Sequence, residues 1–119
     1  MSDADTELLD EGWSLMKLRP ADTGLPMAVW INENDGYQHD VRVKVSKLYG
    51  GGGSWRHDSV SVGVRPVPHE IVPGSLPTAD FALVHQWIEL NRQTIIDHWD
   101  GVIPATEVGR HLKRLPRGR

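Results

Sequence analysis

The chain has 119 residues, a net charge of −3 and no cysteine. This length suits one domain with its own core, and the lack of cysteine excludes disulfide frameworks, zinc–thiolate sites and thiol catalysis. No apolar run approaches the roughly 18–20 residues that span a bilayer, and the acidic start lacks the basic and apolar regions of a signal peptide. We therefore expect a cytoplasmic protein with no membrane partner.

Charge is distributed unevenly between the two ends. The start is acidic (Asp3, Asp5, Glu7, Asp10, Glu11) and the end is basic (Arg110, Lys113, Arg114, Arg117, Arg119). We expect a disordered lead over 1–10, a single α+β domain over 11–115 and a basic tail over 116–119. The tail is either a solvated terminus or a contact for an acidic partner or a phosphate backbone.

The first third of the chain predicts two strands and a turn. Residues 13–18 alternate loosely and favour a first strand, whereas 19–26 hold two prolines and a glycine and indicate a loop. The apolar run 27–31 predicts a buried strand. Residues 32–36, NENDG, are typical of a turn.

The strongest strand signal lies on either side of a glycine run at 50–53. Valines at 41, 43 and 45 and at 60, 62 and 64 alternate with small or polar residues. This predicts an antiparallel hairpin of 40–49 with 55–64, with Val43 opposite Val60 and a flexible tip. One face would be valine. The other would carry polar side chains: Asp40, Arg42, Lys44, Ser46, His57, Ser59, Ser61 and Arg65.

The segment 78–101 is the longest clean pattern and predicts a helix over 78–100. Its apolar stripe comprises Phe81, Val84, Ile88, Ile95 and Trp99, widened by Leu83, Trp87 and Leu90. Thr78 or Asp80 can cap its start, and Gly101 can end it in a left-handed turn. The four prolines within 66–77 exclude a regular element there. A short second helix follows within 103–115, with Pro104 in its first turn.

These elements predict an α+β fold. A small, mostly antiparallel sheet of three to five strands would be packed by one long C-terminal helix, with a short terminal helix after it. The helix stripe would bury against the valine face of the sheet.

Two polar residues, Asn91 and His98, fall inside the apolar arc of the long helix. Buried polar groups need partners. Either they tie the helix to backbone and sit at its rim, or they line a small polar pocket under Trp87 and Trp99. Trp55, which follows the glycine run, is either an exposed contact residue or folds back onto the hairpin.

No motif for catalysis is present. The pairs His39-Asp40 and His57-Asp58 would lie too far apart along the hairpin to share a metal. The glycine run lacks the Lys-Ser/Thr and the helix of a phosphate loop. The sequence thus predicts no catalytic residue, no metal site and no cofactor, and it leans against an enzyme without excluding one.

The stretch 87–101 carries the pattern W-x-x-x-N-x-x-x-I-x-x-x-W-x-G, at Trp87, Asn91, Ile95, Trp99 and Gly101. It resembles the C-terminal helix of small uncharacterised bacterial proteins, a family of unknown function. The resemblance covers about 30 residues and implies an α+β domain and a bacterial source. It assigns no activity.

Three functions stay open. The first is a non-catalytic module that binds a protein or peptide, or a second copy of itself, through a sheet edge or the polar face with Arg42, Lys44 and the Trp55 tip. The second is a small-molecule-binding protein or small enzyme with a pocket near Asn91 and His98. The third, less favoured because the net charge is negative, is nucleic-acid binding through the tail and the hairpin face.

Overall fold

The computed structural model describes residues 15–116. Five strands, β1 (Leu15–Leu18), β2 (Met27–Asn32), β3 (Arg42–Tyr49), β4 (Ser59–Gly63) and β5 (His69–Glu70), form one antiparallel sheet in chain order. Three helices accompany it: α2 (Pro20–Thr23), α3 (Thr78–Trp99) and α4 (Ala105–His111). The predicted α+β class is confirmed. The predicted lead at 1–10, and residues 117–119 of the tail, lie outside the described residues.

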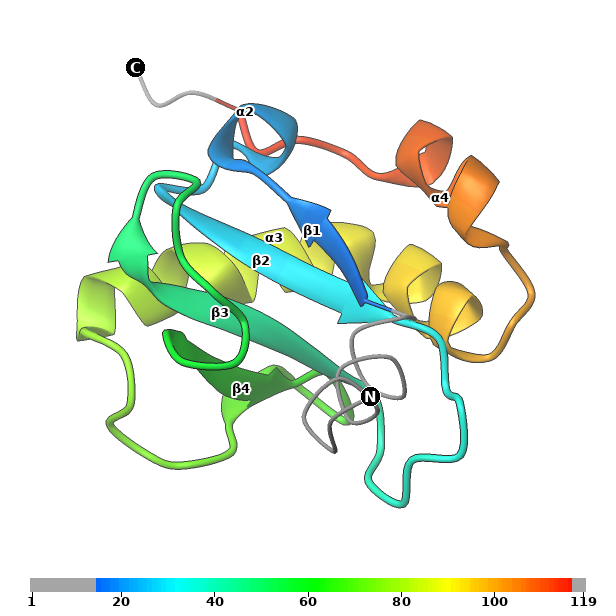
Figure 1. Cartoon of the computed structure of the whole chain (residues 1–119), viewed down its shortest axis with the longest axis horizontal. Coiled ribbons are helices and arrows are strands. Elements are labelled where there is room, and N and C mark those ends of the chain that lie inside the picture. The colour runs from blue at the N-terminus through cyan, green and yellow to red at the C-terminus, as the bar shows by residue number, and fades with distance from the viewer. Residues whose placement is uncertain (1–14, 117–119) are drawn as a thin grey trace, which may run out of the picture.

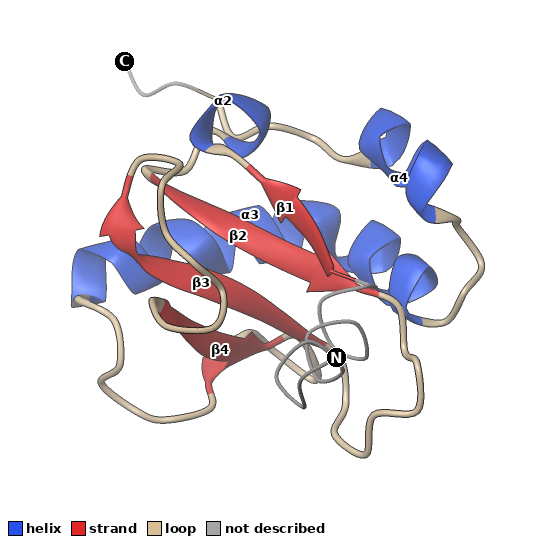
Figure 2. Cartoon of the chain, in the orientation of Figure 1, coloured by secondary structure: helices blue, strands red, loops and turns tan. Residues whose placement is uncertain are grey.

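The sheet and the long helix form two layers. Figures 1 and 2 show α3 behind one face of the sheet, with α4 beyond the β1 side. The core lies between these layers, where Val43, Val45 and Val62 of the sheet meet Val84, Trp87 and Ile88 of α3, all with side chains at 0 % exposure. Each such side chain contributes about 1.5–3 kcal/mol on burial. We call this the inner face of the sheet, and the opposite one the outer face.

The predicted hairpin register is wrong by two residues. Val43 pairs with Val62 and Val45 with Val60. A shift by two keeps valine against valine, because side chains alternate with period two, so the pattern could not distinguish the registers. The turn decides. The Asp58 N–H donates to the Ser54 carbonyl (2.8 Å), and the Asp58 carboxylate accepts from the Ser54 N–H (2.9 Å), so β4 begins only at Ser59.

The expected flexible tip folds back across the outer face, in front of β3 (Figure 1). Lys17 on β1 donates from Nζ to the Gly53 carbonyl at 3.3 Å. A Cβ at Gly53 would overlap Ser46 Oγ, so this close approach requires glycine. Trp55 is accordingly half-buried.

The long helix matches its predicted bounds but not its predicted cap. Pro77 is the N-cap and offers no side-chain hydrogen bond, while Asp80 accepts instead from the Tyr49 hydroxyl at 2.8 Å. Gly101 ends the helix at φ 78°, as expected for a left-handed turn. Leu90, assigned to the apolar stripe, is 40 % exposed, because it lies at the far margin of the arc.

Short elements occur where irregular chain was expected. Within 19–26, Pro20 starts the single turn α2, and the Asp22 carboxylate accepts from the Arg19 N–H at 2.9 Å. The two-residue β5 interrupts the proline-rich 66–77. The second helix is shorter than 103–115, since Pro104 is its N-cap rather than part of its first turn. No helix within residues 15–116 is long and apolar enough to cross a bilayer.

Candidate functional site

Asn91 is buried and fully engaged in holding the C-terminal segment. It is 2 % exposed, its Nδ2 donates to the carbonyl of Lys113 (2.9 Å) and its Oδ1 accepts from the N–H of Lys113 (2.6 Å). The amide thus pairs with both backbone groups of one extended residue, as a neighbouring strand would. Nδ2 also donates to the Trp87 carbonyl (3.0 Å), so both amide N–H groups are used, which confirms that Asn91 ties the helix to backbone.

His98 is buried too, but only one of its ring nitrogens is satisfied. It is 1 % exposed, and Nδ1 lies 2.9 Å from the Ile103 carbonyl. Nε2 has no hydrogen-bond partner among the described residues. The residue lines a cavity of about 440 Å³. The cavity is bounded by Leu15, Met16, Glu33, Asn34, Asp35, His98 and Ala105.

Trp87, eleven residues before His98 on α3, presents the same feature. Its side chain is 0 % exposed, and its Nε1 has no partner within residues 15–116. It lines a second cavity, of about 290 Å³. The walls are Met16, Lys17 and Leu18 of β1, Asp22 and Thr23 of α2, and Gly109 and Leu112 at the end of α4.

The two cavities follow β1 from end to end. Both include Met16, and α4 lines one at Ala105 and the other at Gly109. Trp87 lines one cavity and His98 the other, and Asn91, where the backbone of α3 departs from helical geometry (φ −116°, ψ 15°), lies between them along the chain. We name the two cavities together the β1-edge groove. Its sides are β1 and α4, and its lining includes Trp87 and His98, each with one buried ring nitrogen that has no hydrogen-bond partner among residues 15–116.

β1 itself is an edge strand. Among the described residues it pairs only with β2, through Leu15–Asn32 to Leu18–Val29. Every second residue of an antiparallel edge strand directs its N–H and C=O away from its partner. The groove thus combines unpaired strand backbone with polar atoms that lack hydrogen bonds.

The other predicted site residues lie elsewhere, on the outer face. Arg42 and Lys44 border a cavity of about 460 Å³ with Leu15, Asn32, Tyr37 and His39. Lys44 Nζ lies 5.7 Å from the Trp55 ring centre, and the Arg56 guanidinium 4.8 Å from it. Trp55 thereby contacts two cations of its own chain. The structure brings Arg42, Lys44 and Trp55 together but separates them from Asn91 and His98.

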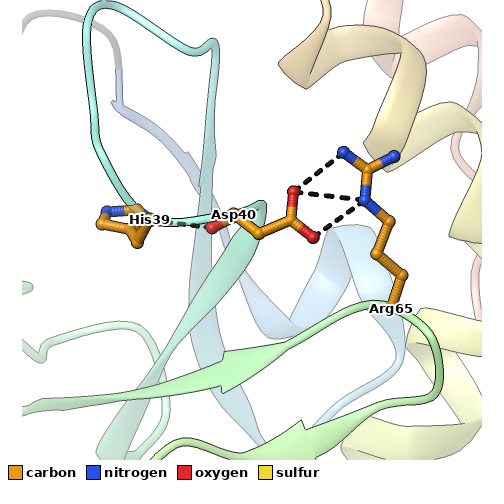
Figure 3. A network of polar contacts seen from close by, with 3 residues as sticks. All are labelled: His39, Asp40 and Arg65. Carbon is orange, nitrogen blue, oxygen red and sulfur yellow. Dashed lines mark hydrogen bonds and ion pairs between the residues drawn. The ribbon is translucent and has the colours of Figure 1, made fainter.

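An ion pair fastens the start of β3 to the end of β4. Figure 3 shows Arg65 reaching the Asp40 carboxylate, at 2.8 Å for the closest pair, while His39 Nδ1 contacts the Asp40 carbonyl at 2.7 Å. The Arg65 hydrogen bond holds the pKa of Asp40 at about 2, below its ordinary 3.8. The side chains are 36 % and 54 % exposed, so this pair is structural and weak.

Nothing in residues 15–116 gathers three potential metal ligands. Another cavity, of about 710 Å³, lies between α2 and the C-terminal segment, and most of its wall is proline, glycine and aliphatic side chain. Within residues 15–116 it offers no converging titratable groups, which an active site would need.

No protein-family model matches this chain, and no curated protein or solved structure matches it either. The site must therefore be interpreted from its own geometry.

Sequence reasoning found His98 and Asn91 but missed Trp87 as a polar residue and missed Glu33 altogether. Trp87 was assigned to the core for its ring, although a buried indole N–H also needs a partner. The spacing of Trp87, Asn91 and His98 on one helix face was the available signal. Glu33 reaches His98 only through tertiary packing, so no local pattern marks it.

Proposed function

We propose that this protein is a peptide-binding module that receives an extended segment of another protein along β1, in the β1-edge groove. The observation that carries this is an edge strand beside two cavities lined by Trp87 and His98, each with a buried ring nitrogen that has no partner within the described part of the chain. An extended peptide supplies what both lack: main-chain groups for the strand edge, and carbonyl or N–H groups for the rings.

The dimensions fit an extended chain. Trp87 and His98 are eleven residues apart on α3, or about 16 Å at 1.5 Å per residue. A strand rises about 3.3 Å per residue, so five peptide residues cover this distance. Asn91, which lies between them in the sequence, already forms hydrogen bonds with the backbone N–H and C=O of Lys113. The proposal requires similar hydrogen bonds from Trp87 and His98 to a peptide backbone.

The edge is a better binding surface than the outer face. Lys44 and Arg56 stack on Trp55, and Lys17 holds the tip, so these groups are already used within the molecule. A small-molecule site at Asn91 is weakened because its amide is fully bonded. The proposal needs no catalytic group. The lack of cysteine suits the reducing cytoplasm of the bacterial source that the helix motif implies.

The test is selection from a phage library of random twelve-residue peptides, followed by affinity measurements on the selected peptides. Gly109 lines the groove, and a Cβ there would meet no atom within 4 Å. Gly109→Leu should therefore fill the groove without unfolding α4 and weaken binding at least about tenfold, or ~1.4 kcal/mol. Gly109→Ala is the matched control and should bind as the wild type does.

Trp87→Phe keeps an aromatic ring and removes the N–H, and it should weaken binding by about tenfold, the value of one hydrogen bond of ~1.4 kcal/mol. Trp55→Phe, a change on the outer face at a residue that does not line the groove, should leave affinity unchanged. Failure to enrich peptides, or wild-type affinity in Gly109→Leu, would refute the proposal. A dimer at micromolar concentration that Gly109→Leu dissolves would assign the groove to a second copy instead.

A further inference from the structure

The outer face of the sheet holds a cavity with a different character from the β1-edge groove. We call it the outer-face cavity. It measures about 460 Å³ and is lined by Leu15, Asn32, Tyr37, His39, Arg42 and Lys44. All six residues are partly or fully buried. Among residues 15–116 its lining includes two cationic side chains and no carboxylate. Positive charge therefore gathers around a hollow rather than on an open surface.

The sheet gives Arg42 no carboxylate partner. Its cross-strand neighbour on β4 is Gly63, which has no side chain. Asp40 lies two residues before Arg42, but its carboxylate is engaged by Arg65 at 2.8 Å (Figure 3). Arg42 forms no salt bridge within residues 15–116. Its guanidinium thus lines the cavity with its donor fork available for an anion.

Lys44 adds a second positive charge on the same side of β3, because strand side chains two residues apart share a face. Its cross-strand neighbours, Trp30 and Ser61, are neutral. Its Nζ, 5.7 Å from the centre of the Trp55 ring, belongs to a side chain that lines the cavity. Two adjacent cations match a phosphate monoester, which carries a charge of about −1.5 to −2 at pH 7. The fork of Arg42 also fits two phosphate oxygens.

The rest of the lining favours a neutral, hydroxylated group. Asn32 is 8 % exposed and uses one N–H of its amide on the Glu33 carbonyl at 3.1 Å. Its Oδ1 has no partner within residues 15–116 and is not sealed from solvent. A hydroxyl group both donates and accepts, so it can pair with this oxygen and with the remaining N–H. Leu15 and the ring of Tyr37, stacked 5.2 Å from that of His39, supply apolar surface.

We propose that the outer-face cavity binds a sugar phosphate. The phosphate accepts hydrogen bonds from the Arg42 fork and from Lys44 Nζ. The sugar hydroxyls bond to the Asn32 amide, and the sugar ring lies against Leu15 and Tyr37. The volume of the cavity falls within the range of roughly 300–1,000 Å³ that small-molecule sites occupy. This site is on the outer face, so it does not depend on peptide binding along β1.

The test is a titration of the full chain with glucose 6-phosphate, followed through backbone amide resonances. Saturable shifts should appear at Asn32, Arg42 and Lys44. Arg42→Gln should weaken binding at least about tenfold, because the charged fork is lost, and Arg42→Lys should fall between it and the wild type. Lys47→Gln removes a charge from an exposed position on the same strand and should leave affinity unchanged. Urea midpoints show that each variant is folded.

The two halves of the probe test the two halves of the site. Glucose alone should cause no shift, and inorganic phosphate should bind at least about threefold more weakly than glucose 6-phosphate, because it lacks the contacts of the sugar. Equal affinity for inorganic phosphate, or tighter binding of gluconate, would overturn the assignment to a sugar phosphate. Tighter binding of a uridine hexanucleotide would assign the cavity to RNA instead.

The absence of saturable shifts at millimolar glucose 6-phosphate would also refute the inference, as would wild-type affinity in Arg42→Gln. These results leave the peptide-binding proposal untouched, because Arg42 does not line the β1-edge groove. Selected peptides should bind Arg42→Gln as they bind the wild type.

Discussion

A single carboxamide, Asn91, connects the long helix to the C-terminal segment. Truncating it leaves the N–H and C=O of Lys113 in a half-buried place without their partner. We expect Asn91→Ala to lower the free energy of unfolding by ~1–3 kcal/mol, the usual effect of orphaning such groups. Urea denaturation measures this. Glu89→Ala, an exposed position on the same helix, should stay within about 0.5 kcal/mol of wild type, and equal midpoints for the two variants would contradict the assignment.

The Asp40–Arg65 ion pair gives a pH-dependent contribution of known sign. The pKa of Asp40 is lowered to about 2 in the folded state, first by the Arg65 hydrogen bond. A depressed carboxyl pKa stabilises the fold above the unfolded value near 4 and ceases to do so as pH falls through about 2. Because both side chains are more than a third exposed, the contribution is at most about 1 kcal/mol.

The stability difference between wild type and Asp40→Asn should accordingly be present at pH 6 and shrink between pH 4 and 2. Urea midpoints over this range provide the measurement. Arg65→Gln should show the same loss at pH 6, and the double variant should lose little more. A difference that does not change with pH would mean that the carboxylate charge contributes nothing.

At the scale of elements, the inner stripe of α3 should dominate stability. Trp87 and Ile88 are both at 0 % exposure, so Trp87→Ala and Ile88→Ala should each cost ~2–5 kcal/mol, as core truncations do. Leu90→Ala, on the same helix but 40 % exposed, should cost well under half as much. Chemical denaturation of the three variants tests this order, and similar losses for all three would mean that the wrong face of α3 was assigned to the core.

The glycine run at the tip of the hairpin offers a second pair of variants to compare at the scale of elements. A Cβ at Gly53 overlaps Ser46 Oγ, which accepts from the Leu48 N–H at 3.0 Å, whereas a Cβ at Gly52 meets nothing within 4 Å. Gly53→Ala should therefore destabilise by about 1–3 kcal/mol, and Gly52→Ala should be close to neutral. Thermal unfolding of both variants measures this difference in stability. If they behave alike, the tip does not pack on the outer face.

For the whole molecule, the sequence predicted the layers better than the details that make a site. Valine alternation and the stripe of 78–100 indicated a sheet and a helix because each pattern repeats over many residues. The register failed because a two-residue shift preserves the pattern, and only the Ser54–Asp58 turn selects the true pairing. The predicted N-cap of α3 was wrong, because Pro77 takes that position and Asp80 bonds to Tyr49, 31 residues away.

The same limit applies to the candidate site. Asn91 and His98 could be identified from the sequence because they are polar residues within the apolar arc of the helix. A polar side chain buried there must find a hydrogen-bond partner. The groove could not be identified, because β1, α4 and Glu33 converge only in three dimensions. For Trp55 the sequence left open an exposed contact residue or a ring folded back onto the hairpin, and only the structure shows that the ring contacts Lys44 and Arg56.

The most direct test of the account is amide hydrogen exchange with and without a saturating selected peptide. The sheet has two edges, β1 and the two-residue β5, and only β1 borders the groove. We expect exchange at Met16–Leu18 to slow at least tenfold on binding, as edge amides gain partners, and exchange at His69–Glu70 to stay unchanged. Slowing at β5 or at Arg42–Lys44, with β1 unaffected, would contradict the claim that the protein recognises extended peptides along β1.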